Sequence, residues 1–272
     1  THDDESVQGG LQALGQSSRQ CLPGLPPLDE ARHPGHGQES RHVKGSLEAM
    51  GLRAGDRVMV HSSLSSIGHV EGGAPTIVQA LLDVLGPSGT LMVPTFTHSS
   101  CEYFDPLLSP SLNGMITEAA RSLPGAVRSL HPTHAVTAIG PDAEELVEED
   151  LDRGALGRDC ALDRLIKKGG YVLLLGVDHR ANSSIHIGED YAGDDRRKSI
   201  SPEHPKVVVL NHPQRGEEEV TLTEMMGHTI AFDRMDGVVR SRGQVVEGKI
   251  GEATCQLMKG QDIIAATLDI LR

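Results

Sequence analysis

Short apolar runs alternate with longer amphipathic stretches between residues 44 and 200. The apolar runs 57–60 (RVMV), 90–94 (TLMVP) and 171–177 (YVLLLGV) are predicted to be buried strands. Residues 75–86 (PTIVQALLDVLG) have apolar positions at helical spacing, a proline in the first turn and a terminal glycine, so they are predicted to form a helix. A strand, a loop, a helix and a second strand make a βαβ unit, which favours parallel pairing.

The alternation continues more loosely toward the C-terminus. A strand is predicted at 134–140, and helices are predicted at 141–150, 160–170 and, after a loop, within 181–193. Farther along, antiparallel strands are predicted at 206–210, 217–222 and 237–248, and a helix interrupted at Gly260 is predicted at 251–271. We therefore expect an α/β fold with a largely parallel central sheet flanked by helices, and a smaller mixed C-terminal region.

Residues 1–43 differ from the rest of the chain. Ten of these positions are Gly or Pro, which interrupt regular structure. We expect an irregular N-terminal lead-in over 1–43 and a single domain over 44–272, which starts with a short helix ending at Gly51.

Composition narrows the function classes. The chain has 25 Lys and Arg against 38 Asp and Glu, a net charge of −13, which argues against binding to nucleic acid. No apolar stretch is long enough to predict a membrane span, and no secretory signal is visible, so a cytoplasmic location is expected. The four cysteines form no CxxC pair, which predicts neither a disulfide framework nor a zinc ribbon.

The loop His61–Gly73 follows the first predicted strand and precedes a helix. It contains four serines, among them Ser62, Ser63 and Ser65, and three glycines, Gly68, Gly72 and Gly73. Exposed amides at a helix N-terminus can bind a phosphate or diphosphate. The spacing fits neither a P-loop nor GxGxxG, so an ordinary turn is the alternative.

Two pairs of residues that include histidine suggest a catalytic or metal-binding site. His186 and Glu189 would share one helix face, where the carboxylate could orient a general base; half of a metal site and a structural pair are the alternatives. His131 and His134 flank a proline after Arg128, which suggests either a metal site or, as we favour, histidines held by backbone bonds. No metal is expected at either pair. An acidic run from Glu144 to Asp152 is predicted to be mostly a solvated helix face.

Several stretches in order carry a family resemblance. They are residues 58–97 (VMVHSSLSSIGHVEGGAPTIVQALLDVLGPSGTLMVPTFT), 103–106 (YFDP), 124–141 (PGAVRSLHPTHAVTAIGP) and 171–190 (YVLLLGVDHRANSSIHIGED). Together they resemble the antibiotic N-acetyltransferases typified by the aminoglycoside 3-N-acetyltransferases. The resemblance implies acetyl-CoA as the cosubstrate and a small polycationic amine as the acceptor, with the 3-amino group of an aminoglycoside antibiotic favoured.

The resemblance also implies roles for individual residues. Glu189 would belong to the catalytic His–Glu pair, and Asp105 would lie on the acceptor side. We expect His186 to be the catalytic partner of Glu189, and Asp150 to bind the acceptor. Acetyl-CoA would be bound by Ser62, Ser63, Leu64, Ser65, Val70, Gly72, Gly73, Thr97, Arg128 and Ser129.

One departure from the family pattern bears on catalysis. Members usually carry a histidine about ten residues before Ser-Pro-Leu, whereas this chain has Asp150 and then Cys160-Ala161-Leu162. Asp150 could be a weak base or a cation ligand, or His186 or His134 could replace the histidine. A non-catalytic relative that binds CoA or an aminoglycoside, and an acyltransferase of natural-product biosynthesis with another amine, are the alternatives. The oligomeric state is expected to be a monomer or a homodimer.

Overall fold

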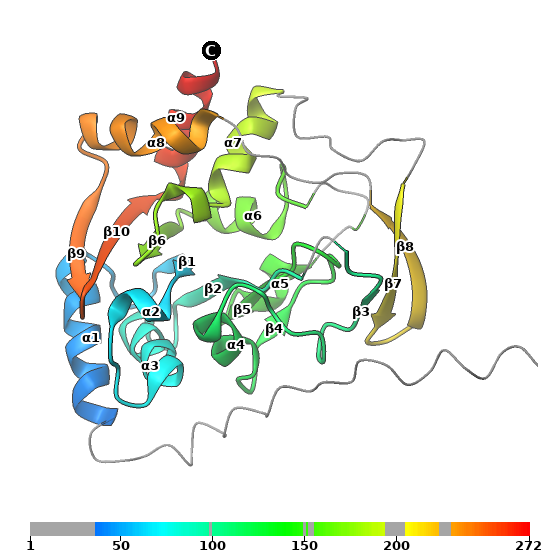
Figure 1. The fold of residues 1–272 in the computed structure, drawn as a ribbon, viewed down its shortest axis with the longest axis horizontal. Coiled ribbons are helices and arrows are strands. Elements are labelled where there is room, and N and C mark those ends of the chain that lie inside the picture. Colours follow the sequence, from blue (N-terminus) through cyan, green and yellow to red (C-terminus); the bar gives the residue numbers. More distant parts are fainter. Residues whose placement is uncertain (1–35, 98–99, 149–150, 152–154, 194–204, 223–229) are drawn as a thin grey trace, which may run out of the picture.

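A seven-stranded sheet runs through the middle of the computed structural model, which describes residues 36–97, 100–148, 151, 155–193, 205–222 and 230–272. The strand order is β4-β5-β2-β1-β6-β10-β9 (Figure 1). In that order the strands are Val127–Arg128, Val136–Ile139, Thr90–Pro94, Arg57–Ser62, Tyr171–Leu175, Ala253–Lys259 and Val246–Ile250.

The sheet is mixed. Strand β1 pairs in parallel with β2 and with β6, whereas the four outer pairings are antiparallel. The predicted α/β class and the parallel βαβ unit are confirmed, but the expectation of a largely parallel sheet holds only for the three central strands. On one side of the central strands, the chain turns tightly at Gly251 between β9 and β10. Strand β10 therefore runs antiparallel both to β9 and to β6.

Alternate residues of the central strands enter two separate apolar cores. Val58 and Val60 pack with four helices, whereas Met59 packs with five helices on the opposite face. The first group is α1 (His36–Met50), α2 (Leu64–Ile67), α3 (Gly73–Leu85) and α4 (Met115–Arg121). The second is α5 (Ala143–Val147), α6 (Ala161–Lys167), α7 (Ser184–Ala192), α8 (Ile230–Ser241) and α9 (Gly260–Leu271) (Figure 1).

A small sheet lies beside the main one. In it β3 (Tyr103–Phe104) pairs in parallel with β7 (Lys206–His212), which pairs antiparallel with β8 (Gly216–Leu222). The predicted hairpin strands at 206–210 and 217–222 are confirmed. The smaller mixed region was expected at the C-terminus. Its sheet instead includes β3 from the middle of the chain, and the C-terminal strands β9 and β10 belong to the main sheet.

Three boundaries differ from the sequence expectation. Helix α1 begins at His36, before the boundary expected at residue 44, because Val43, Leu47 and Met50 form one buried face of a longer helix. Residues 1–35 of the expected lead-in lie outside the described chain. Residues 237–241, predicted as strand, end α8, while residues 253–259, predicted as helix, form β10. No helix among the described residues combines the length and apolar character that a membrane crossing requires.

Candidate active site

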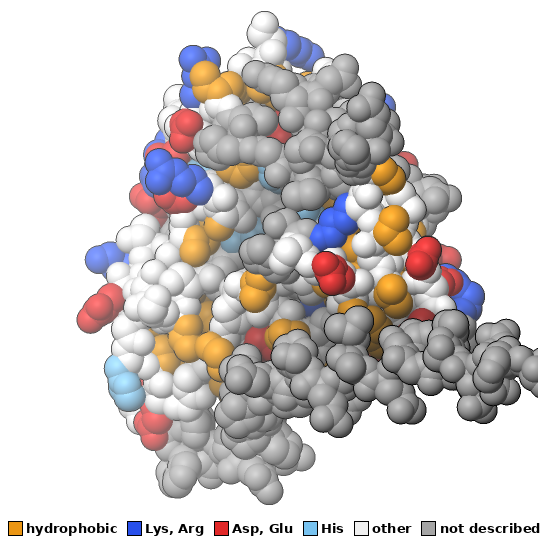
Figure 2. All heavy atoms as spheres, turned by 45° about the vertical axis from the view of Figure 1, so that its right-hand side comes forward, with side chains coloured by type: hydrophobic (Ala, Val, Ile, Leu, Met, Phe, Trp, Pro, Cys, Tyr) orange, Lys and Arg blue, Asp and Glu red, His pale blue; other side chains and the backbone are white. Residues whose placement is uncertain are grey.

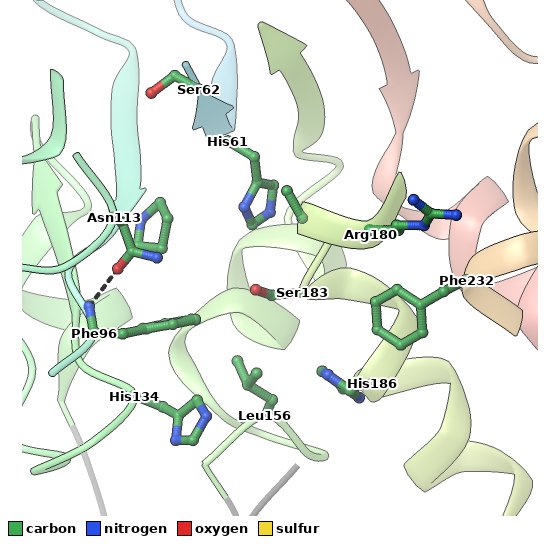
Figure 3. Close-up of a pocket in the computed structure, with 12 residues that line it drawn as sticks. His61, Ser62, Phe96, Asn113, His134, Leu156, Arg180, Ser183, His186 and Phe232 are labelled. Carbon is green, nitrogen blue, oxygen red and sulfur yellow. Dashed lines mark hydrogen bonds between the residues drawn. The ribbon is translucent and has the colours of Figure 1, made fainter. Parts of the chain in front are cut away.

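A cavity of about 390 Å³ opens at the carboxyl ends of the three parallel strands. Ligands of open α/β sheets collect at this edge, where the connections leave the strands. In the view of Figure 2 the surface is hollowed near its centre, and histidine side chains are visible in this hollow. The lining residues are His61, Ser62, Pro94, Phe96, Asn113, His134, Leu156, Arg180, Ala181, Ser183, His186 and Phe232 (Figure 3).

His186 and Glu189 form a hydrogen-bonded pair on α7. His186 Nδ1 lies 2.7 Å from Glu189 Oε2, and the Glu189 side chain is fully buried. The imidazole also packs edge-on against Phe232 of α8, with 5.0 Å between ring centroids. Because the carboxylate engages Nδ1, Nε2 is the nitrogen that can exchange a proton with a bound molecule. The predicted sharing of one helix face is confirmed.

Close packing of α7 on α9 sets the position of this pair. Gly188 lies between the two residues in sequence, and a Cβ atom added to it would stand 2.4 Å from Cβ of Thr267. Real Cβ atoms do not approach so closely, so glycine is the residue that allows α7 and α9 to meet here.

His131 and His134 have different environments. His131 is buried, and its Nδ1 accepts hydrogen bonds from the backbone amides of Thr133 and His134. This is the backbone-held histidine that the sequence favoured. His134 lines the cavity and contacts the Thr133 hydroxyl through Nδ1 at 2.9 Å. Burial, with a further contribution from His186, lowers the pKa of His134 to about 4, so its ring is neutral at pH 7.

His61 is the cavity residue that sequence reasoning passed over. It lies near the end of β1 and is 3% exposed, and neither of its ring nitrogens makes a hydrogen bond with a described residue. Burial, together with the neighbouring His179, lowers the pKa of His61 to about 3. Its position in the sequence could have identified His61 as a cavity residue, because it directly precedes Ser62 at the end of a strand.

The serines of the first loop have different environments. Ser62 lines the cavity, while Ser63 Oγ accepts from Ser66 at 2.9 Å and lies 3.2 Å from Ser65 Oγ. The short helix α2 (Leu64–Ile67) follows, with Leu64 and Val70 packed against the apolar core.

The loop then leads into α3 through two glycines. Gly72 caps α3 in the left-handed conformation, and Gly73 also has a positive φ, with open space where a side chain would stand. The helix N-terminus is thus bordered by residues without side chains, as close approach of a ligand to the backbone requires.

Arg128 and Ser129 are buried and Thr97 is half-buried, and none of the three is among the described residues that line the cavity. The Arg128 guanidinium donates to the carbonyl oxygens of Thr95 and Ser109, each at 2.5 Å, and stacks over Phe104. Burial lowers the pKa of Arg128 to about 10, which leaves it charged at pH 7.

The hydroxyls beside Arg128 also have partners within the protein. Ser129 Oγ accepts from the Val136 amide at 3.0 Å, and Thr97 Oγ1 donates to the Pro132 carbonyl. These three side chains hold the chain segments at the ends of β2 and β5 together, and the structure does not bring them to the cavity.

Asp105, one of the predicted acceptor residues, lies apart from the described residues that line the cavity. Asp105 borders a separate hollow of about 280 Å³ beside Asn211. Its carboxylate accepts from the amides of Leu107 and Leu108 and from the Asn211 side chain at 2.9 Å. Burial opposes ionisation, yet these hydrogen bonds keep the pKa of Asp105 below its ordinary value. Asp150 and Asp152 lie outside the described residues.

Other cavity residues were missed for reasons of topology. Arg180 and Ser183 follow the end of β6, so the rule that ligands bind at strand ends could have identified them. Asn113 and Phe232 come from segments whose structure the hydrophobic pattern did not predict, before α4 and on α8. Within the described ranges, no three His, Cys, Asp or Glu side chains gather as metal ligands would.

Known proteins match this chain in sequence and in fold. The family described as aminoglycoside 3-N-acetyltransferase matches residues 59–272. Aminoglycoside N(3)-acetyltransferase VII of Streptomyces paromomycinus is 31% identical over 247 residues, which cover 80% of this chain and 86% of that protein.

Two solved structures share the fold. AAC-IIIb in binary complex with CoASH has a TM-score of 0.76 and 27% identity, covering 85% of this chain and 95% of that one. A mutant of AAC(3)-IVa in complex with a gentamicin has a TM-score of 0.75 and 29% identity, with coverages of 85% and 87%.

Proposed function

The chain belongs to the aminoglycoside 3-N-acetyltransferase family, and from that membership we propose that it transfers the acetyl group of acetyl-CoA to an amine of a small polycationic acceptor. The 3-amino group of an aminoglycoside antibiotic is the acceptor that we favour. The observation that carries the proposal is the His186–Glu189 pair, at 2.7 Å, on the wall of the cavity at the ends of the parallel strands.

Proton removal is the task that this pair fits. An alkylammonium group has a pKa of about 10, so it must lose a proton before its nitrogen can attack a thioester. His186 Nε2 accepts that proton, and Glu189 holds the ring through Nδ1 and stabilises the imidazolium that forms. This arrangement favours catalysis over simple binding, and it supplies a histidine although the family's usual one is replaced by Asp150.

The first loop and the start of α3 are the proposed place for acetyl-CoA. The exposed N-terminus of a 13-residue helix carries a partial positive charge that favours the phosphates. Ser62 borders the cavity, so the acyl end of the molecule would reach His186 from this side. A structural neighbour solved with CoASH supports this cosubstrate. Arg128 and Ser129 would then act through the shape of the surrounding loops.

The acceptor amine is proposed to bind beside His186. Glu189 places its carboxylate behind that ring, and the role of Asp150 as a cation ligand stays a prediction. A structural neighbour solved with a gentamicin supports an aminoglycoside as the acceptor. We also propose a cytoplasmic location, where acetyl-CoA is available, and a monomer or homodimer that binds no nucleic acid.

A product assay tests the proposal. The protein is incubated with acetyl-CoA and a panel of aminoglycosides, alongside simple diamines and polyamines, while thiol release is followed. We expect thiol release with aminoglycosides and a single added acetyl group by mass spectrometry, which NMR should locate on the 3-amino nitrogen. Thiol release with simple amines alone would favour another amine acceptor. Thermal stabilisation by CoASH or an aminoglycoside without product would favour the non-catalytic alternative.

A further inference from the structure

His61 combines burial at the cavity with two ring nitrogens that lack partners among the described residues. Leaving a buried polar group without a hydrogen bond destabilises the folded protein. The ring projects from β1 into the space above Ser183 (Figure 3). An unsatisfied imidazole at the wall of a binding cavity is explained when the molecule that enters the cavity completes its hydrogen bonds.

The environment of His61 excludes the role of a base. With a pKa of about 3, the ring stays neutral at the pH where acetyl transfer occurs, so it does not store a proton. A neutral imidazole still carries one N–H, and no described residue engages either nitrogen, so the tautomer can adapt to a ligand. His61 can therefore donate a hydrogen bond to an oxygen atom without giving up its proton.

We propose that His61 is a catalytic residue that donates a hydrogen bond from its neutral ring to the carbonyl oxygen of the acetyl thioester. This inference rests on the proposed function, because it assigns a role within the same site. It divides two tasks between two histidines of one cavity: His186, held by Glu189, handles the proton, and His61 stabilises the charge that develops on oxygen.

His186 first takes one proton from the alkylammonium and releases it to solvent. The lone pair of the neutral amine then forms a bond to the thioester carbonyl carbon, the carbonyl π electrons move onto oxygen, and a second proton, from the nitrogen that has become positively charged, passes to His186 Nε2. The resulting oxyanion is held by the N–H of His61. Collapse of this intermediate re-forms the carbonyl and breaks the carbon–sulfur bond. The thiolate of CoA then takes the proton from His186, which leaves an amide and CoASH.

An analogue that cannot react tests this hydrogen bond directly. In acetyldethia-CoA a methylene replaces the thioester sulfur, so the carbonyl remains but no acetyl transfer occurs. With ¹³C at the carbonyl, a hydrogen bond from the protein moves the carbon resonance downfield. We expect that downfield shift in the wild-type protein and its loss in His61→Leu. His61→Gln, which keeps an N–H donor, should preserve part of it.

A matched control separates the proposed role from the general effect of losing a buried imidazole. His212 is also a buried histidine, but it borders the separate hollow beside Asn211. His212→Leu should leave the carbonyl resonance unchanged. In turnover, His61→Leu should lower kcat about 10²–10³-fold, as expected for one oxyanion donor, with little change in KM for acetyl-CoA.

An unshifted carbonyl resonance in the wild-type complex would overturn the inference. An equal downfield shift in wild type, His61→Leu and His61→Gln would overturn it as well. If His61→Leu fails to fold, the comparison with His61→Gln still decides it. Binding of the analogue is measured by calorimetry without any acceptor. A shift that depends on His61 in a protein that acetylates no aminoglycoside would keep the inference and refute the proposed acceptor.

Discussion

His186 and Glu189 face each other across one turn of α7, with Nδ1 2.7 Å from Oε2. The carboxylate is fully buried, while the imidazole is at the cavity wall. A buried carboxylate held beside a ring that borders a cavity is the arrangement in which one residue orients and the other exchanges protons with a bound molecule. The pair therefore acts as a unit.

Loss of either member of the pair should abolish most of the activity. His186→Ala is expected to lower kcat about 10²–10⁴-fold, the usual contribution of a general base, and Glu189→Gln should cost nearly as much because the two act together. Steady-state kinetics with acetyl-CoA and an aminoglycoside measure the effect. His42→Ala, at an exposed position of α1, is the control and should retain full activity. Wild-type kcat in Glu189→Gln would contradict the orienting role.

Negative charge at the start of α3 should weaken the binding of acetyl-CoA. Gly73→Asp places a carboxylate where the phosphates are proposed to bind, and Asp tolerates the left-handed conformation better than most residues. We expect the KM for acetyl-CoA to rise about tenfold, corresponding to about 1.4 kcal/mol of lost binding free energy. Gln79→Glu makes the same charge change at an exposed position farther along α3 and should leave KM unchanged. Equal effects of the two variants would argue against phosphate binding at this terminus.

Arg128 should matter for stability and little for CoA affinity. Arg128→Lys removes several of the hydrogen bonds to Thr95 and Ser109, and we expect the free energy of unfolding to fall by about 3 kcal/mol. Urea unfolding gives the stability, and calorimetry with CoASH gives the affinity. Arg41→Lys, at an exposed position of α1, controls for the residue change. Weaker CoASH binding with unchanged stability would instead support the direct contact that the family resemblance implies.

Acid should destabilise the fold through buried neutral histidines. Burial lowers the pKa of His61 and His131 to about 3, whereas an unfolded histidine has a pKa near 6.5. Below pH 6.5 the unfolded chain binds more protons than the native one, so the stability contributed by each residue is present above that pH and is lost toward pH 3. Between pH 7 and 5 the loss is about 2 kcal/mol for each histidine.

The His131 contribution can be isolated by substitution. His131→Asn keeps a side-chain oxygen that can accept from the Thr133 amide but does not titrate, so its stability should fall less between pH 7 and 5 than that of the wild type. Urea midpoints at several pH values measure the difference. Parallel curves for the two proteins would show that His131 does not take part in the acid destabilisation.

Much of the central fold could be predicted because local pattern and tertiary role agree there. The runs at β1, β2 and β6 are apolar at nearly every position, as strands covered on both faces must be. Strand β10 was harder because Ala253, Cys255 and Leu257 alternate with more exposed residues, a period-2 signal inside a segment whose end is truly helical. Parallel or antiparallel pairing at the flanks depends on the path of the chain, which periodicity does not encode.

In the candidate site, too, contacts within one element could be predicted and contacts between distant segments could not. The helical spacing of His186 and Glu189 predicts their contact, because both partners lie on one element. Asp105 and Arg128 could not be assigned in this way, since their partners, Asn211 and Thr95, lie far away in sequence. A polar residue in a recognisable motif can serve packing or chemistry, and its role depends on which distant groups fold against it.

The contact between Gly188 and Thr267 sets an order in time. The segment that carries His186 and Glu189 leaves the ribosome well before α9, yet α7 takes its position by packing against that later helix. Strand β6, which leads toward α7, likewise gains its antiparallel partner β10 only when that later segment has been synthesised. The His186–Glu189 pair is therefore expected to reach its final position only after residue 267 has been synthesised and released from the exit tunnel, and activity is expected only after translation of this region is complete.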